Sequence, residues 1–590
     1  MSASGQSRQV RPFEDVAEMN DANPSIIESR RDQIFPHLDA TDIARTRRFG
    51  EIRRFAAGEA LAAIGKVGLG LAVILSGQVD VYRHDAHGRR QHLYTFGPGA
   101  FVGELAQLAG QPSFGDGIVT EPVEALIFSP DRMRALLIAE AELGERLMRA
   151  LILRRTQMLQ SGVGGPVIIG GSENGDVLRI EGFLARNATP RMMLDPDTDP
   201  EARALIDRFQ VDPGQLPLVV CPGGQVLRNP SVTDLARCMG LVGPIDRHRL
   251  YDVAIVGAGP AGLATSVYAA SEGLSVLTLD SRSFGGQAGA SARIENYLGF
   301  PTGISGMALM ARAYNQAHKF GVETAIPNEV IGFDASDDPA ASFGLKLASG
   351  ERVSTRSVVI ASGVNYRRLA VENLDAYEGA SVHYWASQIE ARLCADQEVV
   401  VVGAGNSAGQ GIVFLASHVA KVWVLARGGD LDSTMSRYLV DRITGLANVE
   451  VLTRTQVTAL EGADGRLSAV HWHRAATGET VRRPIRHLFL FIGADPNIGW
   501  LSGSGVALDP KGFVLTGAEV EKNRHPLETS RPGVYAIGDI RSGSIKRVAA
   551  AVGEGAQVVA ALHSYLSPQH AVRMTPVPAE ATTATKQRLP

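Results

Sequence analysis

The chain has 590 residues, of which 45% are hydrophobic and 20% are charged, and its formal net charge is -4 at pH 7. A chain of this length exceeds what one hydrophobic core usually supports, so we expect several domains. The small net charge, without a dominant block of lysine and arginine, argues against nucleic-acid binding and against a polybasic membrane contact. The polar N-terminus does not resemble a secretory signal and no apolar run reaches membrane-spanning length, so we expect a cytoplasmic protein.

The three cysteines are Cys221, Cys238 and Cys394, and none are spaced as Cys-x-x-Cys. This spacing argues against a disulfide scaffold, a zinc site and a local redox dithiol. No metal site is therefore predicted.

The N-terminal third of the chain begins with a polar stretch over residues 1–39, which we expect to be a flexible lead. Between Phe49 and Phe128, short apolar runs alternate with glycine-bearing turns, such as Ser76-Gly77-Gln78, as in a small antiparallel barrel or jelly roll. Helical periodicity then predicts one long helix from Asp131 to about Gln160. Together these features predict a β-roll with a closing helix over residues 40–160.

After a glycine-rich linker near residues 161–166, strand and helix signals alternate over residues 166–242, which predicts a small α/β unit. From residue 250 onward they alternate at the spacing of parallel-sheet units. Residues 568–590, with several prolines and threonines, are expected to form a disordered tail.

A first glycine-rich turn, Gly257-Ala258-Gly259-Pro260-Ala261-Gly262, follows the apolar strand DVAIV and precedes a helical run. In such a turn the first glycine permits the bend, the second lets the backbone approach a pyrophosphate, and the third lets helix and strand pack closely. The next strand ends at Asp280, whose carboxylate would accept hydrogen bonds from a ribose. This order of elements predicts a dinucleotide site.

A second turn, Gly403-Ala404-Gly405-Asn406-Ser407-Ala408-Gly409, follows the strand EVVVV and has Ala408 as its third small residue. The strand after it ends in Arg427 instead of an acid. A cation there suits a ribose 2'-phosphate, which favours NADPH over NADH. The alternative is an ordinary solvent-exposed arginine.

Two dinucleotide sites on one chain indicate an electron relay, because a simple nicotinamide dehydrogenase needs only one. A flavin is the natural partner, since it accepts a hydride from NADPH and passes electrons on singly or in pairs. We therefore expect FAD and NADPH as cofactors.

Residues 251 to about 567 resemble the low-molecular-weight thioredoxin reductases, within the pyridine nucleotide-disulfide oxidoreductase group. Besides the two turns, the resemblance lies in Gly285-Gly286-Gln287, in the run from Ile294 to Pro301, and in the segments VVIASG, FIGADPN and PGVYAIGD. It implies that Asp539, after Gly538, binds the ribityl chain and that Gln287 and Asn296 lie near the isoalloxazine. It also implies an NADPH domain that is inserted into the FAD domain and rotates during turnover.

The chain departs from that family at its redox centre. Where the family has Cys-x-x-Cys followed by an acid, this sequence reads Ala386-Ser387-Gln388-Ile389-Glu390. Thiol–disulfide exchange requires a thiolate, so an internal dithiol relay is not expected. Glu390 keeps a carboxylate at the position of the family's general acid and is the catalytic candidate, with a helix-surface glutamate as the alternative.

A second departure follows Asp539. The family's Arg-Gln pair near the flavin is replaced by Lys546-Arg547-Val548-Ala549. The helix that runs through Gly553 to Gly555 is still expected to point its N-terminus at the flavin, where it would stabilise negative charge.

Residues 40–160 resemble a bacterial cyclic nucleotide-binding domain, in which Gly103 and Glu104 match the phosphate-binding cassette. The arginine expected near residues 113–116 is missing, and Asp116 adds negative charge. A degenerate sensor or a dimerisation module is therefore favoured over a working receptor, and the closing helix offers an apolar face for a homodimer.

Residues 166–242 resemble a thioredoxin or glutaredoxin fold, with Leu216-Pro217 at the usual cis-proline position. This unit also lacks a dithiol, so docking or scaffolding is expected, with Cys221 as a buried residue.

The leading hypothesis is an NADPH-dependent FAD oxidoreductase of thioredoxin-reductase type that passes electrons to an unidentified acceptor, such as a quinone, a small carrier or oxygen. One alternative is a flavin-based redox sensor coupled to the degenerate nucleotide module, for which a nucleotide effector is left open. Another is delivery to a separate disulfide protein through an external thiol.

The expected domains are residues 1–39 (lead), 40–160 (cyclic nucleotide-binding-like β-roll), 166–242 (thioredoxin-like α/β), 250–365 and 496–567 (Rossmann-like, FAD), 366–495 (Rossmann-like, NADPH) and 568–590 (tail). The cofactor-binding candidates are Gly257, Gly259, Pro260, Ala261, Gly262, Asp280, Gly286, Gln287, Asn296, Gly403, Gly405, Asn406, Ser407, Ala408, Arg427, Gly538, Asp539, Val548 and Ala549.

Overall fold

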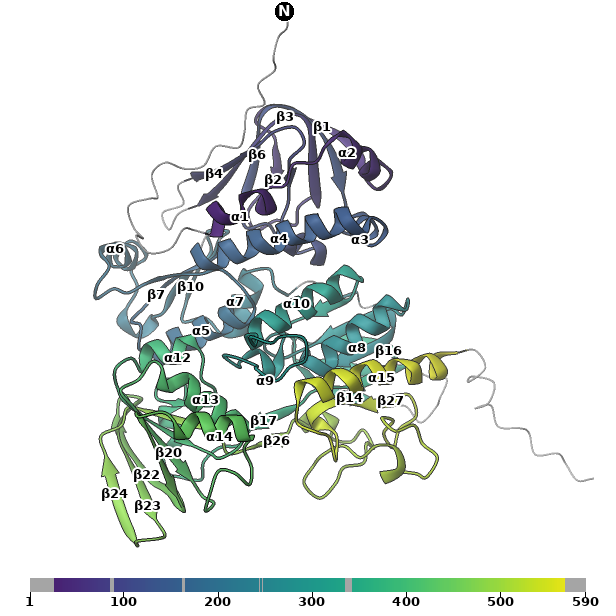
Figure 1. Ribbon diagram of the computed structural model, residues 1–590. Helices are drawn as coiled ribbons and strands as arrows, with labels where there is room; N and C mark the ends of the chain where they lie inside the picture. Colours follow the sequence, from purple (N-terminus) through teal and green to yellow (C-terminus); the bar gives the residue numbers. More distant parts are fainter. Residues whose placement is uncertain are drawn as a thin grey trace, which may run out of the picture.

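The structure is a computed structural model that describes residues 26–84, 90–161, 165–242, 245–246, 248–334 and 342–567. In these ranges the chain forms a β-roll unit (26–161), a small unit (165–242), a main unit (248–363 and 497–567) and an inserted unit (364–496), which are coloured in chain order in Figure 1. The expected C-terminal tail lies outside the described residues. None of the described helices is both long and apolar enough to cross a bilayer.

The β-roll unit is built on a six-stranded antiparallel sheet in which β3 pairs with β6. The prediction of a turn at Ser76-Gly77-Gln78 is wrong. The chain continues through it as a single strand, and the register with β6 shifts on both sides of Gly77, whose φ is +82°. A bulge of this kind absorbs an extra residue without ending a strand. The strands are β1 (Glu51–Phe55), β2 (Ala60–Ala62), β3 (Leu71–His84), β4 (Arg90–Phe96), β5 (Phe101–Val102) and β6 (Asp116–Phe128).

The single closing helix predicted from Asp131 is two helices, α3 (Pro130–Ala139) and α4 (Ala141–Ser161). They meet at Glu140, whose carboxylate accepts hydrogen bonds from Arg45 Nε (2.8 Å) and Arg48 Nη2 (2.6 Å). The apolar residues of α4 are buried in the core of the β-roll unit itself, so the apolar face that we expected to be available for a homodimer is already covered. The other elements are α1 (Ile26–Ile34), α2 (Ala40–Thr46), η1 (Arg47–Phe49) and η2 (Leu105–Ala109).

Part of the expected flexible lead is helical. Helix α1 packs against α4, and its last residue, Ile34, is almost fully buried, as is Leu38, which follows the helix. The β-roll unit therefore begins earlier than residue 40.

The small unit has a four-stranded mixed sheet in the order β10-β9-β7-β8, with α5 and α7 packed on its apolar residues. The peptide bond between Leu216 and Pro217 is cis. Cys221 follows β9 and forms a disulfide with Cys238, the last residue of α7, with the two Cα atoms 6.3 Å apart. The expectation that the cysteines form no disulfide is therefore wrong. The elements are β7 (Val167–Ile169), α5 (Gly175–Arg186), β8 (Met192–Leu194), α6 (Pro200–Phe209), η3 (Pro213–Gln215), β9 (Leu218–Val220), β10 (Val226–Arg228) and α7 (Val232–Cys238).

The main unit confirms the expected parallel α/β pattern. Strand β11 lies between β12 and β16, both parallel to it, and β27 from the C-terminal segment pairs with β16. Helices α8 and α15 lie side by side on this sheet (Figure 1). The elements are β11 (Leu250–Val256), α8 (Pro260–Ser271), β12 (Val276–Leu279), α9 (Gly286–Gly289), α10 (Gly306–Lys319), β13 (Glu323–Ala325), β14 (Val330–Asp334), β15 (Phe343–Leu347), β16 (Arg352–Ile360), η4 (Gly499–Leu501), η5 (Gly517–Glu519), β27 (Val534–Ala536), η6 (Gly538–Ile540) and α15 (Val548–Leu566).

The inserted unit has a parallel five-stranded sheet in the order β18-β25-β19-β20-β21 and a three-stranded antiparallel sheet, β22-β23-β24. A short ribbon, in which β17 pairs with β26, stands where the chain enters and leaves this unit. The elements are β17 (Val364–Tyr366), α11 (Leu374–Tyr377), β18 (Val382–His383), α12 (Gln388–Leu393), β19 (Glu398–Val402), α13 (Asn406–Ala416), β20 (Lys421–Ala426), α14 (Arg437–Thr444), β21 (Val449–Thr453), β22 (Thr455–Ala463), β23 (Arg466–Arg474), β24 (Glu479–Arg483), β25 (His487–Leu490) and β26 (Ala494–Pro496).

Candidate functional site

A cavity of about 1160 Å³ is lined by residues of both the main and the inserted unit. Gly257 and Gly259 of the first glycine turn line it, and so do Asn406 and Ser407 of the second. The two turns, far apart in sequence, therefore open into one space. Of the other predicted residues, those that line the same cavity are Pro260, Ala261, Asp280, Gly286, Gln287, Asn296, Gly538, Asp539, Val548 and Ala549.

The first turn has the tight geometry that its glycines predict. Gly257 has a φ of +115°, and a Cβ there would collide with the backbone of Ala361. A Cβ on Gly262 would collide with the carbonyl oxygen of Gly257. Gly259 is the N-cap of α8, and no atom lies closer than 3.9 Å to where its Cβ would be. The first amides of α8 thus stand at an open cradle that suits a phosphate group.

Asp280 fixes this turn from the end of β12. Its carboxylate accepts hydrogen bonds from the backbone N–H of Ala258 (3.0 Å), Arg282 (2.9 Å) and Ser283 (3.3 Å). Burial nevertheless raises its pKa. Asp280 lines the cavity beside the turn, as expected for a residue that meets a ribose.

The start of α15 and the loop before it also line the cavity. Val548 is the first residue of this helix, so its unpaired amides and the positive end of its dipole face the cavity. Burial raises the pKa of Asp539, and the Lys546 ammonium donates to the Asp539 carbonyl oxygen at 2.5 Å. Gln287, which also lines the cavity, donates from Nε2 to the carbonyl oxygen of Val364 at 2.6 Å, and this hydrogen bond fixes its side chain.

The second turn is similarly built. Gly403 has a φ of +143°, a Cβ there would collide with Phe491, and Gly405 caps α13. Asn406 Oδ1 accepts from the backbone N–H of Ser436 at 2.7 Å, just before α14. Four predicted residues of this site do not line the cavity: Gly403, Gly405, Ala408 and Arg427.

Glu390 is 6% exposed and lies outside the cavity lining. It closes a capping box with Ser387, whose backbone N–H donates to Glu390 Oε2 at 2.9 Å. Its other oxygen accepts from the Trp385 indole N–H at 2.9 Å. The structure therefore gives this carboxylate a positioning role, because it holds the start of α12 and the Trp385 ring.

A cluster of four side chains at the cavity was missed from the sequence. Tyr366 and Tyr384 stack with ring centroids 5.9 Å apart, and Tyr366 lies 6.3 Å from the Trp385 ring. Arg186, at the end of α5 in the small unit, places its guanidinium carbon 3.9 Å from the Trp385 ring centroid. Tyr384 and Trp385 stand directly before the positions where the family has its dithiol, and this place in the sequence could have predicted that they line the site. Nothing in the sequence could connect Arg186 with them.

In the β-roll unit, residues of the cassette that resembles a nucleotide site contact other parts of the chain. Glu104 is partly buried, its pKa is raised by burial, and it accepts from the backbone N–H of Phe114 at 2.9 Å. The Arg155 guanidinium from α4 lies 4.7 Å from the Phe114 ring centroid. Phe114 also belongs to the apolar core of the small unit, and the neighbouring helix η2 packs against α10 of the main unit.

Comparisons with known proteins agree with this division of the chain. Residues 251–555, just over half of the sequence, match the family model described as pyridine nucleotide-disulphide oxidoreductase, and residues 52–140 match the cyclic nucleotide-binding domain. A thioredoxin reductase of Mycoplasmopsis pulmonis (strain UAB CTIP) is 31% identical over 312 residues, which cover 53% of this chain and 96% of that protein. The NADPH-dependent thioredoxin reductase 3 of Arabidopsis thaliana is 30% identical over 329 residues, which cover 54% of this chain and 58% of that protein. Among solved structures, a thioredoxin reductase of Lactococcus lactis in the FR conformation shares 27% identity over 53% of this chain and 98% of that one, with a TM-score of 0.49.

Proposed function

Because the chain belongs to the pyridine nucleotide-disulphide oxidoreductase family, we propose that it oxidises NADPH through a bound FAD and delivers the electrons to an acceptor other than an internal dithiol. The observation that carries this proposal is the single cavity lined by both glycine turns. Two dinucleotides bound at these turns would extend into one space, where their reactive rings can meet.

The residues present fit FAD at the first turn. The Gly257 and Gly259 backbone leaves room for a pyrophosphate at the N-terminus of α8, and Asp280 stands where a ribose would lie. Asp539 and the start of α15 would face the ribityl chain and the ring. When bound, the flavin supplies hydride acceptance and onward electron transfer, and the α15 amides favour the negative charge of the reduced ring.

The acceptor side of the proposal rests on what replaces the dithiol. Ala386 and Ile389 carry no thiol, while Tyr366, Tyr384, Trp385 and Arg186 line the cavity beside them. Planar aromatic walls and a cation suit a small planar acceptor such as a quinone. The Cys221–Cys238 disulfide joins a buried strand end to α7 in the small unit, and we assign it a structural role.

Anaerobic titration of the FAD-loaded protein with NADPH tests this function. We expect the flavin absorbance to bleach and uptake to stop at two electrons per flavin, because neither cysteine of the disulfide lines the cavity. Uptake of four electrons that falls to two in Cys238→Ser would instead give the disulfide a redox role. A purified protein that is colourless and does not bind added FAD would refute the proposal.

A second candidate is a redox sensor, which the packing of η2 on α10 favours because it connects the nucleotide-like cassette with the main unit.

We propose that this cassette is a docking element between the β-roll unit and a thioredoxin-like small unit, since Phe114 and Asp116 stand where the phosphate-binding arginine is expected. Added cyclic AMP or cyclic GMP should then leave the melting temperature and the rate of NADPH oxidation unchanged. Fast turnover with one of a panel of acceptors supports the enzyme, whereas slow oxygen reduction alone, together with a nucleotide-induced change, supports the sensor.

A further inference from the structure

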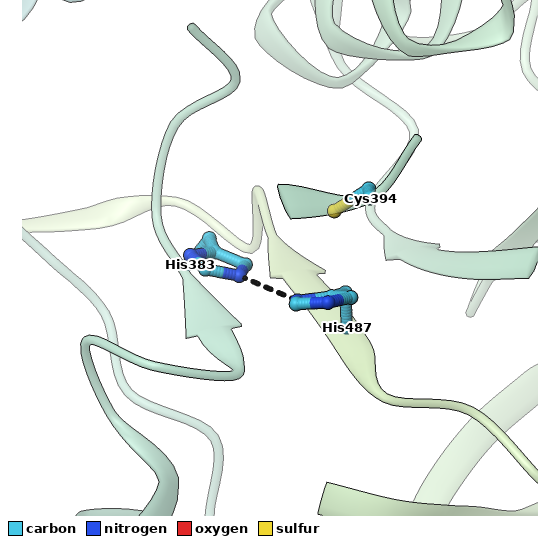
Figure 2. Close-up of side chains that lie close together, drawn as sticks. All are labelled: His383, Cys394 and His487. Atoms are coloured by element: carbon cyan, nitrogen blue, oxygen red, sulfur yellow. Dashed lines mark hydrogen bonds between the residues drawn. The ribbon is translucent and has the colours of Figure 1, made fainter. Parts of the chain in front are cut away.

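Three side chains that could bind a metal meet in the core of the inserted unit, and none of them lines the cavity (Figure 2). His383 ends β18, His487 begins β25, and Cys394 follows α12 as its C-cap. They are 5%, 6% and 0% exposed, respectively. One ligand atom from each lies within 4.8 Å of the others.

The surroundings of this cluster are apolar, which makes its composition informative. Cys394 packs with Val399, Ile412 and Phe489 in one hydrophobic core. Polar groups are costly to bury there unless they find partners. His383 Nε2 and His487 Nδ1 lie 3.2 Å apart and share a hydrogen bond, but Cys394 is a free thiol and, among the residues the structure describes, no hydrogen-bond partner is found for it.

Burial also sets the protonation of the cluster. It lowers the pKa of His383 to about 4 and that of His487 to about 3, with a further lowering of the latter by His383 and Arg486. Both imidazoles are therefore neutral at physiological pH and have lone pairs to donate. Burial raises the pKa of the Cys394 thiol, which stays protonated until a cation displaces its proton.

We propose that His383, Cys394 and His487 form a structural site for one Zn²⁺ ion. Imidazole nitrogen and thiolate sulfur are the donors that zinc prefers, and zinc bonds of about 2.0–2.3 Å place neighbouring donor atoms slightly more than 3 Å apart. The 3.2 Å nitrogen–nitrogen distance already meets this requirement, and the Cys394 sulfur, which lies within 4.8 Å of a ligand atom of each histidine, would have to shift closer to coordinate. The chain supplies three ligands, so a water molecule that enters with the ion would have to complete the tetrahedral coordination.

Binding is balanced by two proton shifts. The thiol proton leaves for solvent as the sulfur coordinates. The hydrogen shared between the two rings moves to the outer nitrogen of its ring, so that His383 Nε2 and His487 Nδ1 both coordinate. The ion then ties β18, β25 and α12 together around the segment in which the related family has its dithiol.

Metal content and cobalt substitution of the full-length protein test this site. We expect about one zinc per chain in protein purified without chelator, and one Co²⁺ per chain with a sulfur-to-cobalt charge-transfer band after exchange. Cys394→Ser should abolish that band and lower affinity at least tenfold, because it removes the thiolate. The matched control pair is His487→Gln, which should lose the metal, and His473→Gln, which alters a partly exposed histidine of β23 outside the cluster and should keep it.

X-ray absorption of the unmutated cobalt form provides a readout that does not depend on whether the variants fold. One sulfur and two imidazole nitrogens in the first coordination sphere are expected. Failure of the native, folded protein to bind zinc or cobalt in stoichiometric amount would overturn the site. So would a coordination sphere without sulfur, or an unchanged band in folded Cys394→Ser.

Discussion

Arg427 stands at the carboxyl end of β20, where its side chain is exposed. Strand β20 pairs in parallel with β19, and the Gly403 N–H donates to the Leu425 carbonyl oxygen at 3.1 Å. Arg427 therefore follows the strand that lies next to the second glycine turn. That position suits the 2'-phosphate of NADPH although Arg427 does not line the cavity itself.

Replacement of this arginine should change the choice of coenzyme. Hydrogen bonds to charged groups contribute about 1.5–3 kcal/mol, so Arg427→Ala should raise the KM for NADPH about ten- to hundredfold and leave that for NADH nearly unchanged. Steady-state kinetics with both coenzymes measure this. Lys421→Ala, at the other end of β20, is the matched control and should keep the NADPH preference. Equal effects of Arg427→Ala on both coenzymes would contradict the assignment.

Single residues also show where prediction from sequence succeeds. The glycines of both turns were predicted because only their backbone geometry permits these bends, and local sequence determines that geometry. Glu390 was predicted as the catalytic candidate, whereas the structure buries it outside the cavity lining, and its hydrogen bonds to Ser387 and Trp385 depend on how α12 begins. The disulfide between Cys221 and Cys238 depends on the packing of α7 against the sheet, and the spacing of cysteines in the sequence does not report that packing.

Helices α8 and α15 approach each other closely at one glycine. A Cβ added to Gly555 would stand 2.6 Å from the Ala261 carbonyl oxygen and 2.8 Å from the Ala264 Cβ. The Thr265 hydroxyl also lies 3.2 Å from the Gly555 carbonyl oxygen. Gly553, half a turn earlier in the same helix, is exposed and has free space around it.

This contrast predicts opposite outcomes for one substitution at two sites. Gly555→Ala should destabilise the protein by about 1–3 kcal/mol, since overpacking pushes α15 away from α8. Gly553→Ala should leave stability unchanged or raise it by up to about 1 kcal/mol, because alanine favours the helix. Thermal unfolding by circular dichroism measures both, and a Gly555→Ala variant as stable as Gly553→Ala would refute the close approach.

The periodicity of the sequence predicted the presence of helices and strands more reliably than it predicted where they end. Strand–turn–helix order in the main and inserted units was predicted because each segment has a strong pattern of its own. The break at Glu140 and the bulge at Gly77 were not predicted. The former is fixed by Arg45 and Arg48 from a segment far away in the sequence, and the latter by pairing with β6.

Across the whole molecule, the small unit is fastened to the inserted unit by charged contacts. Glu173 forms ion pairs with Arg466 (2.7 Å) and Arg486 (3.2 Å). Glu181, whose side chain is 7% exposed, accepts from Arg392 of the inserted unit at 2.6 Å. Arg442 of the inserted unit also pairs with Glu295 of the main unit at 2.8 Å. Rotation of the inserted unit, as in the family it resembles, would have to break these contacts.

Weakening the Glu173 contacts should therefore speed turnover if opening limits the rate. Exposed ion pairs contribute about 0.2–1 kcal/mol each, so Glu173→Gln, which removes two of them, should raise kcat by about two- to thirtyfold and make the rate less sensitive to salt. Stopped-flow and steady-state rates at low and high ionic strength measure this. The control is Glu479→Gln. It removes an exposed carboxylate of β24 that pairs with Arg474 of β23, so both partners belong to the inserted unit. Equal rates for both variants and the parent would show that these pairs do not restrain the motion.

The two strands of the ribbon, β17 and β26, are the points at which the chain crosses between the main and inserted units, and they lie hydrogen-bonded to each other. Two adjacent crossings of this kind would let the inserted unit turn about a single axis. In such a turn the parts of the inserted unit would keep their mutual spacing, while the distance between the two glycine turns would change.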